Sequence, residues 1–117
     1  MAKVKIILPL FEEIQKKFKG EAHKIIDLLE SLEQNPNKGK LLGQVGGIVI
    51  KELRYKSFRF YFITDGYKLK VIDESSLVDL LIRFVRMSDK KDQQETINEI
   101  RKILVNLGPA GFDEKRF

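Results

Sequence analysis

The spacing of apolar residues predicts a strand and then two helices in the first third of the chain. Residues 3–8 form a short apolar run typical of a strand, and Pro9 stands where the first turn of a helix tolerates proline. Apolar side chains then recur at helical spacing through 10–19 and again through 21–34, with a glycine between the two segments. This pattern predicts an antiparallel pair of amphipathic helices, a helical hairpin.

The middle of the chain changes from helical spacing to alternation. Residues 35–47 are rich in glycine and asparagine and include a proline, so they predict a loop. The next segments alternate along their length and are separated by a Lys-Ser pair and then by an Asp-Gly turn signal. They predict three strands, at 48–55, 58–64 and 67–73.

The C-terminal third contains one ambiguous segment and one clear helix. Residues 77–87 fit either a helix or a strand, and the alternation of their apolar side chains favours a strand at about 78–86. A terminal helix is predicted from the capping residue Asp92 to a Gly-Pro stop that follows Leu107. The last residues, 108–117, are expected to form a flexible tail.

The predicted order is strand, helical hairpin, three or four strands and helix, within a single domain that spans 1–117. This order is typical of an α+β fold, in which an N-terminal strand and a helical hairpin pack on a small, twisted, mainly antiparallel sheet with a C-terminal helix. We expect the helices to cover one face of the sheet and to leave the opposite face free for a partner.

The net charge of +5 can be assigned to one stretch of the chain. Residues 38–59 carry six basic side chains and one acidic side chain, whereas the remaining residues carry sixteen of each sign. A basic block within a balanced domain indicates a polyanionic partner, either nucleic acid or an acidic protein segment. The alternative is a solvated strand face that carries lysine and arginine without a binding role.

Composition excludes several classes of protein. The chain is 43% hydrophobic and 33% charged, as in an ordinary globular domain, and no apolar run approaches the ~20 residues that span a membrane. With no cysteine and one histidine, it lacks a disulfide framework, a cysteine nucleophile and the ligands of a typical zinc site. We therefore expect a cytoplasmic protein that uses no membrane, metal ion or cofactor.

Alternation along the two central strands sorts their side chains onto two faces. A row of phenylalanines predicts the face that packs on the helices. Glu52, Arg54, Arg59 and Tyr61 fall on the other face, and alternation in the later strand places Arg83 with them. Converging guanidinium groups suit phosphate recognition, because each presents a planar fork of donors. The alternative is a purely structural ion pair between Glu52 and one arginine.

Short motifs occur in the same segments. The loop ending KLLGQVGG is followed by Glu52-Leu53-Arg54 and then by Arg59-Phe60-Tyr61, and FVRMSDKKDQQETINEIRKIL opens the terminal helix with Lys90-Lys91-Asp92. Together these motifs resemble the patterns of the RelE/ParE/HigB toxin superfamily. The resemblance covers about residues 3–107, and the RelE-like order of strands and helices matches the order predicted above.

The resemblance implies the toxin component of a type II toxin–antitoxin module. Many such toxins are metal-independent endoribonucleases that cut messenger RNA on the ribosome and are neutralised by an acidic antitoxin, whereas the ParE branch acts on DNA gyrase. Carried over by motif, Arg54, Arg59 and Arg83 would stabilise the phosphorane formed when a ribose 2′-hydroxyl attacks the neighbouring phosphate. Glu52 or Tyr61 is then the candidate base. Further cations for binding phosphate or antitoxin are Lys51, Lys56, Arg86, Lys90 and Lys91.

The sequence departs from the family pattern at the end of the last strand. Many active members carry a histidine or tyrosine there as acid or base, whereas this chain reads Arg83-Phe84-Val85-Arg86-Met87-Ser88. Its one histidine, His23, lies in the second predicted helix, where a solvated or core-edge role is expected rather than catalysis. Three functions stay in competition: a ribosome-dependent mRNA endoribonuclease, a non-catalytic protein that binds an antitoxin or gyrase, and a small RNA-binding domain with stacking aromatic side chains.

Overall fold

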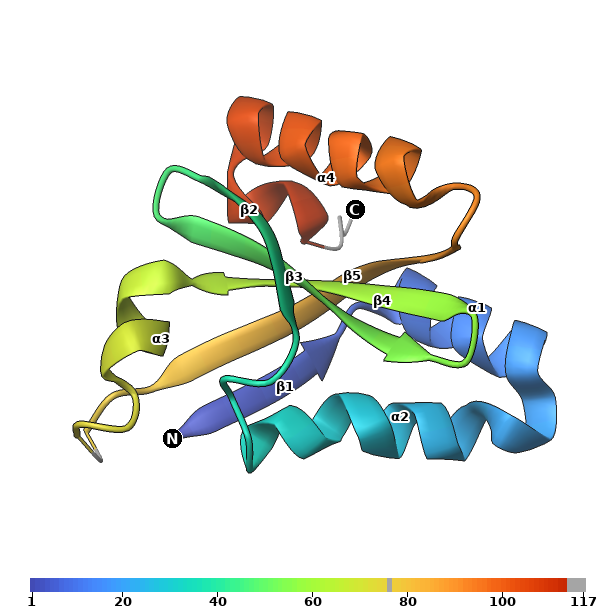
Figure 1. Ribbon diagram of the computed structural model, residues 1–117, viewed down its shortest axis with the longest axis horizontal. Coiled ribbons are helices and arrows are strands. Elements are labelled where there is room, and N and C mark those ends of the chain that lie inside the picture. The colour runs from blue at the N-terminus through green and yellow to red at the C-terminus, as the bar shows by residue number, and fades with distance from the viewer. Residues whose placement is uncertain (76, 114–117) are drawn as a thin grey trace.

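One five-stranded mixed sheet organises the computed structural model, which describes residues 1–75 and 77–113. The strands are β1 (Ala2–Ile6), β2 (Lys40–Val45), β3 (Ile48–Tyr55), β4 (Phe58–Asp65) and β5 (Leu80–Asp89). They lie in the order β1-β5-β4-β3-β2, with β1 parallel to β5 and every other neighbouring pair antiparallel (Figure 1). The α+β class and the mainly antiparallel sheet are therefore confirmed.

Helices and short 3-10 turns connect these strands. They are α1 (Leu8–Phe18), η1 (Lys19–Glu21), α2 (Ala22–Glu30), η2 (Ser31–Glu33), α3 (Gly66–Val71), α4 (Gln93–Leu107) and η3 (Pro109–Phe112). The predicted helical hairpin is confirmed by α1 and α2, with Pro9 in the first turn of α1. Among the described residues, no helix has the length and apolar composition that crossing a bilayer requires.

The loop predicted at 35–47 is wrong for its second half, which contains the edge strand β2. This strand pairs antiparallel with β3, and the pairing closes at the turn after Val45. Gly46 in that turn has a φ of 58°, a left-handed conformation that glycine adopts without steric cost. The glycines that suggest a loop in the sequence therefore make a hairpin turn, and the strand before it was missed.

The strand predicted at 67–73 is also wrong, because Gly66–Val71 forms the short helix α3. The carboxylate of Asp65 accepts a hydrogen bond from the backbone N–H of Lys68 at 2.9 Å. An aspartate in this position satisfies one of the free donors at a helix N-terminus, so the Asp-Gly pair starts a helix here. The later predictions are confirmed, because β5 begins two residues after the start of the strand expected at 78–86 and includes the rest of it, and α4 begins directly after Asp92.

The chain turns back on itself after α4. Gly108 has a φ of 68°, and η3 then returns toward the sheet, where the Phe112 ring is only 5% exposed. A Cβ added to Gly111 would lie 2.6 Å from Cγ2 of Ile103, which shows how closely the turn packs on α4. Residues 109–112 therefore differ from the expected flexible tail. Residues 114–117 of that prediction lie outside the described part of the chain.

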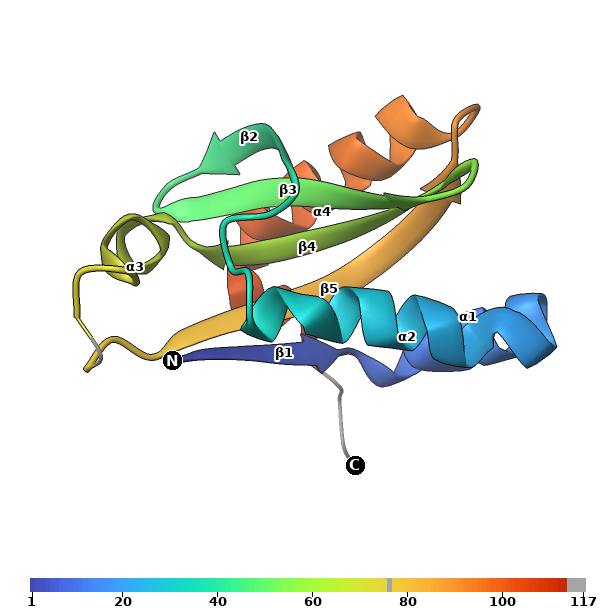
Figure 2. The same ribbon diagram turned by 60° about the horizontal axis from the view of Figure 1, so that its bottom comes forward.

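Helices cover both faces of the sheet, so the expectation of one free face is wrong. The hairpin of α1 and α2 lies on one face, and α4 with η3 lies on the other (Figures 1 and 2). On the hairpin face, the ring of Phe18 packs edge-on against Phe58 with centroids 5.0 Å apart. Buried residues there include the predicted Phe60, Phe62, Leu53, Ile25 and Leu29. On the opposite side, α4 buries Ile97, Ile100 and Leu104.

Candidate functional site

The four central site residues predicted from the sequence share the sheet face that α4 covers. In the register of β3 and β4, Glu52 lies opposite Tyr61 and Arg54 lies opposite Arg59. Because side chains alternate along each strand, all four project on the side away from Phe60. Arg54 is exposed near the end of β3, whereas Glu52, Arg59 and Tyr61 are buried. The predicted cluster therefore exists, but most of it lies beneath a helix rather than on an open surface.

Glu52 and Arg59 form a buried ion pair with incomplete hydrogen bonding. Arg59 Nε lies 3.6 Å from Glu52 Oε2, and the two side chains are 5% and 1% exposed. Neither carboxylate oxygen of Glu52, nor Nε of Arg59, has a hydrogen-bond partner among the described residues. Burying charged groups without such bonds costs free energy. The pair is therefore expected to add little to the stability of the fold. The lone pairs of Glu52 remain free to accept a hydrogen bond or a proton.

Tyr61 belongs to a short hydrogen-bonded chain whose direction can be assigned. Its hydroxyl lies 2.7 Å from Ser88 Oγ, and Ser88 Oγ donates its own hydrogen to the carbonyl of Asp89 at 2.9 Å. Since Ser88 has one hydroxyl hydrogen, Tyr61 must donate to Ser88. Burial raises the pKa of the Tyr61 phenol, and the charge of Glu52 acts in the same direction. Tyr61 is therefore a protonated donor, which argues against its predicted role as a base.

A β-bulge in β5 brings Arg83 and Arg86 to this same face. Arg86 lies opposite Tyr61 and Arg83 lies opposite Ile63, while the register shifts by one residue between them. In a regular strand, side chains three positions apart point to opposite faces, so the extra residue, Val85, is what aligns the two arginines. Four arginines from three strands thus project from one side of the sheet.

The C-terminal segment, which we define as α4, η3 and Asp113, holds both arginines of β5. Arg83 donates from Nη1 to Asp113 Oδ1 at 2.5 Å and from Nη2 to the carbonyl of Pro109. Arg86 donates from Nε to Glu99 Oε1 at 2.5 Å, and its guanidinium lies 5.3 Å from the ring centroid of Phe112. The carboxylates of Asp113 and Glu99, which lie outside the basic stretch 38–59, therefore neutralise Arg83 and Arg86, two of the predicted phosphate ligands.

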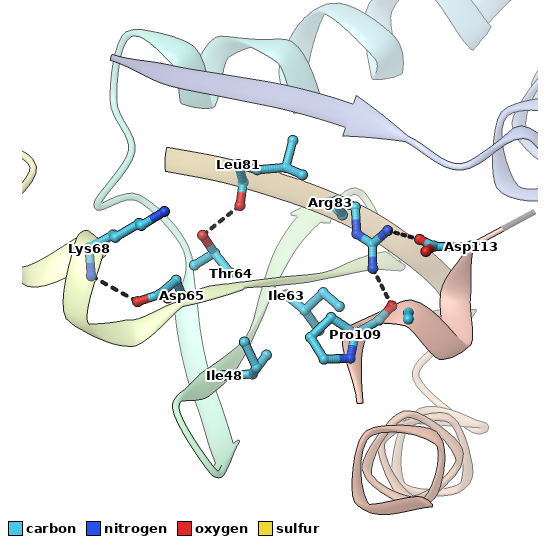
Figure 3. Close-up of a pocket in the computed structure, with 10 residues that line it drawn as sticks. Ile48, Ile63, Thr64, Asp65, Lys68, Leu81, Arg83, Pro109 and Asp113 are labelled. Carbon is cyan, nitrogen blue, oxygen red and sulfur yellow. Dashed lines mark hydrogen bonds and ion pairs between the residues drawn. The ribbon is translucent and has the colours of Figure 1, made fainter. Parts of the chain in front are cut away.

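A shallow pocket opens beside Arg83, as Figure 3 shows. It has a volume of about 310 Å³ and lies between the end of β4, the start of β5, the start of α3 and the turn η3. Its apolar walls include Ile48 and Ile63, and its polar rim carries Lys68. This pocket gives solvent access to the Arg83 end of the face, although the guanidinium itself points to Asp113 and Pro109 (Figure 3).

Lys51 and Lys56, two of the predicted lysines, lie away from the sheet face that carries the four arginines. Lys51 projects toward the hairpin face, where its ammonium donates to the carbonyl of Asn37 at 3.0 Å and burial lowers its pKa. Lys56, in the β3–β4 turn, pairs with Glu21 at 2.9 Å; this hydrogen bond raises the pKa of Lys56. Lys90 and Lys91 are exposed in the turn between β5 and α4. Neither Lys51 nor Lys56 is therefore grouped with the arginines, and Lys51 lies on the face that alternation along β3 gives it.

Sequence reasoning missed the residues that contact the cluster from outside the central strands. No motif in the sequence marks these residues, and only the folded chain brings them to the arginines and Tyr61. They are Ser88, Glu99, Phe112 and Asp113. His23 is exposed in α2, as expected. Within 1–75 and 77–113, no three His, Cys, Asp or Glu side chains gather in a way that could hold a metal ion.

Comparisons with known proteins give no match to this arrangement. No protein-family model matches the chain, and neither a curated protein nor a solved structure matches it significantly.

Proposed function

We propose that this chain is the toxin component of a type II toxin–antitoxin module and acts as a metal-independent, ribosome-dependent mRNA endoribonuclease in the cytoplasm. One observation carries the proposal: Arg54, Arg59, Arg83 and Arg86 share one sheet face with the carboxylate of Glu52. Cleavage of RNA by its own 2′-hydroxyl requires a base near that hydroxyl and cations around the phosphate. The motif resemblance supports the same reading, and an acidic antitoxin is the expected inhibitor.

The proposed roles follow from the protonation states and contacts of the cluster. Glu52 is the base that removes the 2′-hydroxyl proton, because its oxygens have free lone pairs and Tyr61 is held as a donor. The oxygen then attacks phosphorus, and the bond to the 5′-oxygen breaks to leave a cyclic phosphate. Arg54 and Arg59 stabilise the charge of the phosphorane. The protonated phenol of Tyr61 is the candidate proton donor to the departing 5′-oxygen.

The test is translation-dependent cleavage of messenger RNA in the presence of EDTA. Arg54→Ala is the most informative variant, because Arg54 is exposed and its loss leaves the core intact. Removing one well-placed donor costs about 10²–10³ in rate, so we expect a loss of that size for Arg54→Ala and for Arg59→Ala. Lys16→Ala, an exposed cation of α1 on the other side of the sheet, is the matched control. Equal activity of Arg54→Ala and the control would reject the arginine site.

A second candidate function rests on the burial of the cluster. Glu52 and Arg59 are 2% and 4% exposed, which is unusual for groups that must touch a substrate. A non-catalytic relative that binds only an acidic antitoxin, or one directed at gyrase, has no need to expose them. Growth arrest on expression, rescued by an acidic protein encoded beside this gene, is expected for the endoribonuclease and for a gyrase-directed toxin, but not for a protein that only binds an antitoxin. Absence of RNA cleavage together with tight binding of that protein would favour the second candidate.

A further inference from the structure

The C-terminal segment contacts the two β5 arginines with the chemistry that an RNA strand would use. Asp113 and Glu99 each place one carboxylate on a guanidinium, at 2.5 Å in both pairs. A phosphate oxygen forms the same charge-assisted hydrogen bond with an arginine. The aromatic ring of Phe112 lies 5.3 Å from the Arg86 guanidinium, where an unstacked base would stack in a protein–RNA complex.

These contacts are built into the fold at several points. Phe112 is 5% exposed, and the backbone of η3 is fixed by hydrogen bonds from Gly111 N–H to Gly108 C=O and from Asp113 N–H to Ala110 C=O, both at 3.0 Å. The two acidic side chains stay accessible, with 58% of Asp113 and 52% of Glu99 exposed. A competing anion can therefore reach both ion pairs from solvent.

We infer that Glu99, Phe112 and Asp113 form an intramolecular mimic of RNA that occupies a nucleotide-binding subsite made by Arg83 and Arg86. This inference rests on the proposed function and deepens it, because it assigns phosphates to both arginines and a base to the position of Phe112. Single-stranded RNA binds by displacing η3 from Arg83 and the Glu99 side chain of α4 from Arg86. The exchange conserves the ion pairs of both arginines, since phosphate oxygens replace carboxylate oxygens. The C-terminal segment thereby lowers the affinity of the resting protein for RNA.

The experiment removes the two negative charges without changing the shape of the side chains. We compare the full-length protein with Glu99→Gln/Asp113→Asn and with the control Asp27→Asn/Glu30→Gln. The control alters the net charge equally but acts on exposed carboxylates of α2, on the other side of the sheet. The probe is a short single-stranded RNA in which 2′-O-methyl groups prevent cleavage, and its Kd is measured over a range of salt concentrations.

We expect the Glu99→Gln/Asp113→Asn protein to bind RNA about tenfold more tightly than the control at 0.1 M salt. Its plot of log affinity against log salt should be steeper by about 1.4, because two further phosphate contacts on a single strand contribute about 0.7 each. In the unmodified protein, bound RNA should speed amide exchange at Gly111 and Asp113. A purely structural role of the ion pairs predicts neither effect.

The outcomes separate this inference from the proposed function. Equal RNA affinity of the two double variants overturns the mimic, while RNA binding that still depends on Arg54 leaves the proposed function standing. Slower exchange at Gly111 and Asp113 on RNA binding also overturns the mimic. If neither the parent nor any variant binds RNA above the level expected from net charge, the mimic is overturned, and translation-dependent cleavage decides the proposed function separately.

Discussion

The two faces of the central sheet bury side chains of opposite character. Against α1 and α2 the sheet presents Phe60, Phe62 and Leu53, which need no polar partner. Against α4 it presents a carboxylate, a guanidinium and a phenol in addition to isoleucines, and part of this polar set has no hydrogen bond. The hairpin face therefore stabilises the fold through apolar packing, whereas the α4 face gives up stability to place charged groups together. Such a loss is typical of a face that serves binding or chemistry.

Truncation of Phe60 tests the hairpin face. Phe60→Ala should lower the free energy of unfolding by about 3–5 kcal/mol, because the ring is fully buried and its loss leaves a cavity. Urea denaturation at neutral pH measures the change. Tyr67→Ala is the control, since Tyr67 is 74% exposed and its truncation should change stability by less than about 0.5 kcal/mol. A small loss for Phe60→Ala would show that the apolar face does not carry the stability of the domain.

The buried ion pair tests the α4 face with the same method. Arg59→Met should cost about 3–5 kcal/mol, because it leaves the Glu52 carboxylate buried without a counter-charge. The double variant Glu52→Leu/Arg59→Met should recover that loss and can exceed the parent in stability, since apolar packing often replaces a buried pair without penalty. If the double variant is as unstable as the single variant, the pair stabilises the fold and the contrast between the faces disappears.

Packing of the C-terminal turn is a smaller contribution to the α4 face. Gly111→Ala should destabilise the protein by about 1–3 kcal/mol, because the new Cβ would lie 2.6 Å from Ile103 and 2.9 Å from Leu107. Gly20→Ala is the matched control, because no atom lies within 4 Å of a Cβ added there. Thermal unfolding followed by circular dichroism distinguishes them. Equal behaviour of the two variants would mean that η3 is not held against α4.

Ionisation of Tyr61 gives the smallest effect and depends on pH. The pKa of its phenol is raised above the usual 10.0 in the folded protein, mainly by burial, so folding favours the protonated form. The contribution of Tyr61 to stability, about 1 kcal/mol for its hydrogen bond, is therefore fully present below pH 10 and is lost as the pH rises through the raised pKa. The difference in stability between the parent and Tyr61→Phe, measured across this range, should shrink accordingly. A constant difference would place Tyr61 in contact with solvent.

Local patterns in the sequence predict most of the fold but fail where a contact decides between two structures. Alternation identifies β3, β4 and the two faces, because the period of a strand is fixed by its backbone. It also suggests a strand at 67–73, where the Asp65 side chain instead caps a helix. The edge strand β2 was missed because Gly43, which faces Arg101, and the Gly46-Gly47 turn resemble a loop in composition.

For the candidate site, the sequence predicts only the face of its strand from which each side chain projects. That criterion groups Glu52, Arg54, Arg59 and Tyr61 correctly, but it cannot show that α4 covers them. Two partners that neutralise the arginines, Glu99 and Asp113, come from 13 and 30 residues away in the chain. Their contacts depend on how the C-terminal segment returns to the sheet, and no short-range pattern encodes this return.

The bulge at Val85 gives β5 a change of parity. Upstream of it, odd-numbered residues such as Arg83 face α4, and downstream of it the even-numbered Arg86 and Ser88 do so. If Val85 instead joined a regular ladder, it would lie opposite Tyr61, and every later side chain of the strand would turn to the opposite side, with Arg86 facing the hairpin. The bulge thus allows two arginines three positions apart in the sequence to lie on the same face of one strand. A regular ladder through Val85 would change the charge of that face without replacing any charged residue.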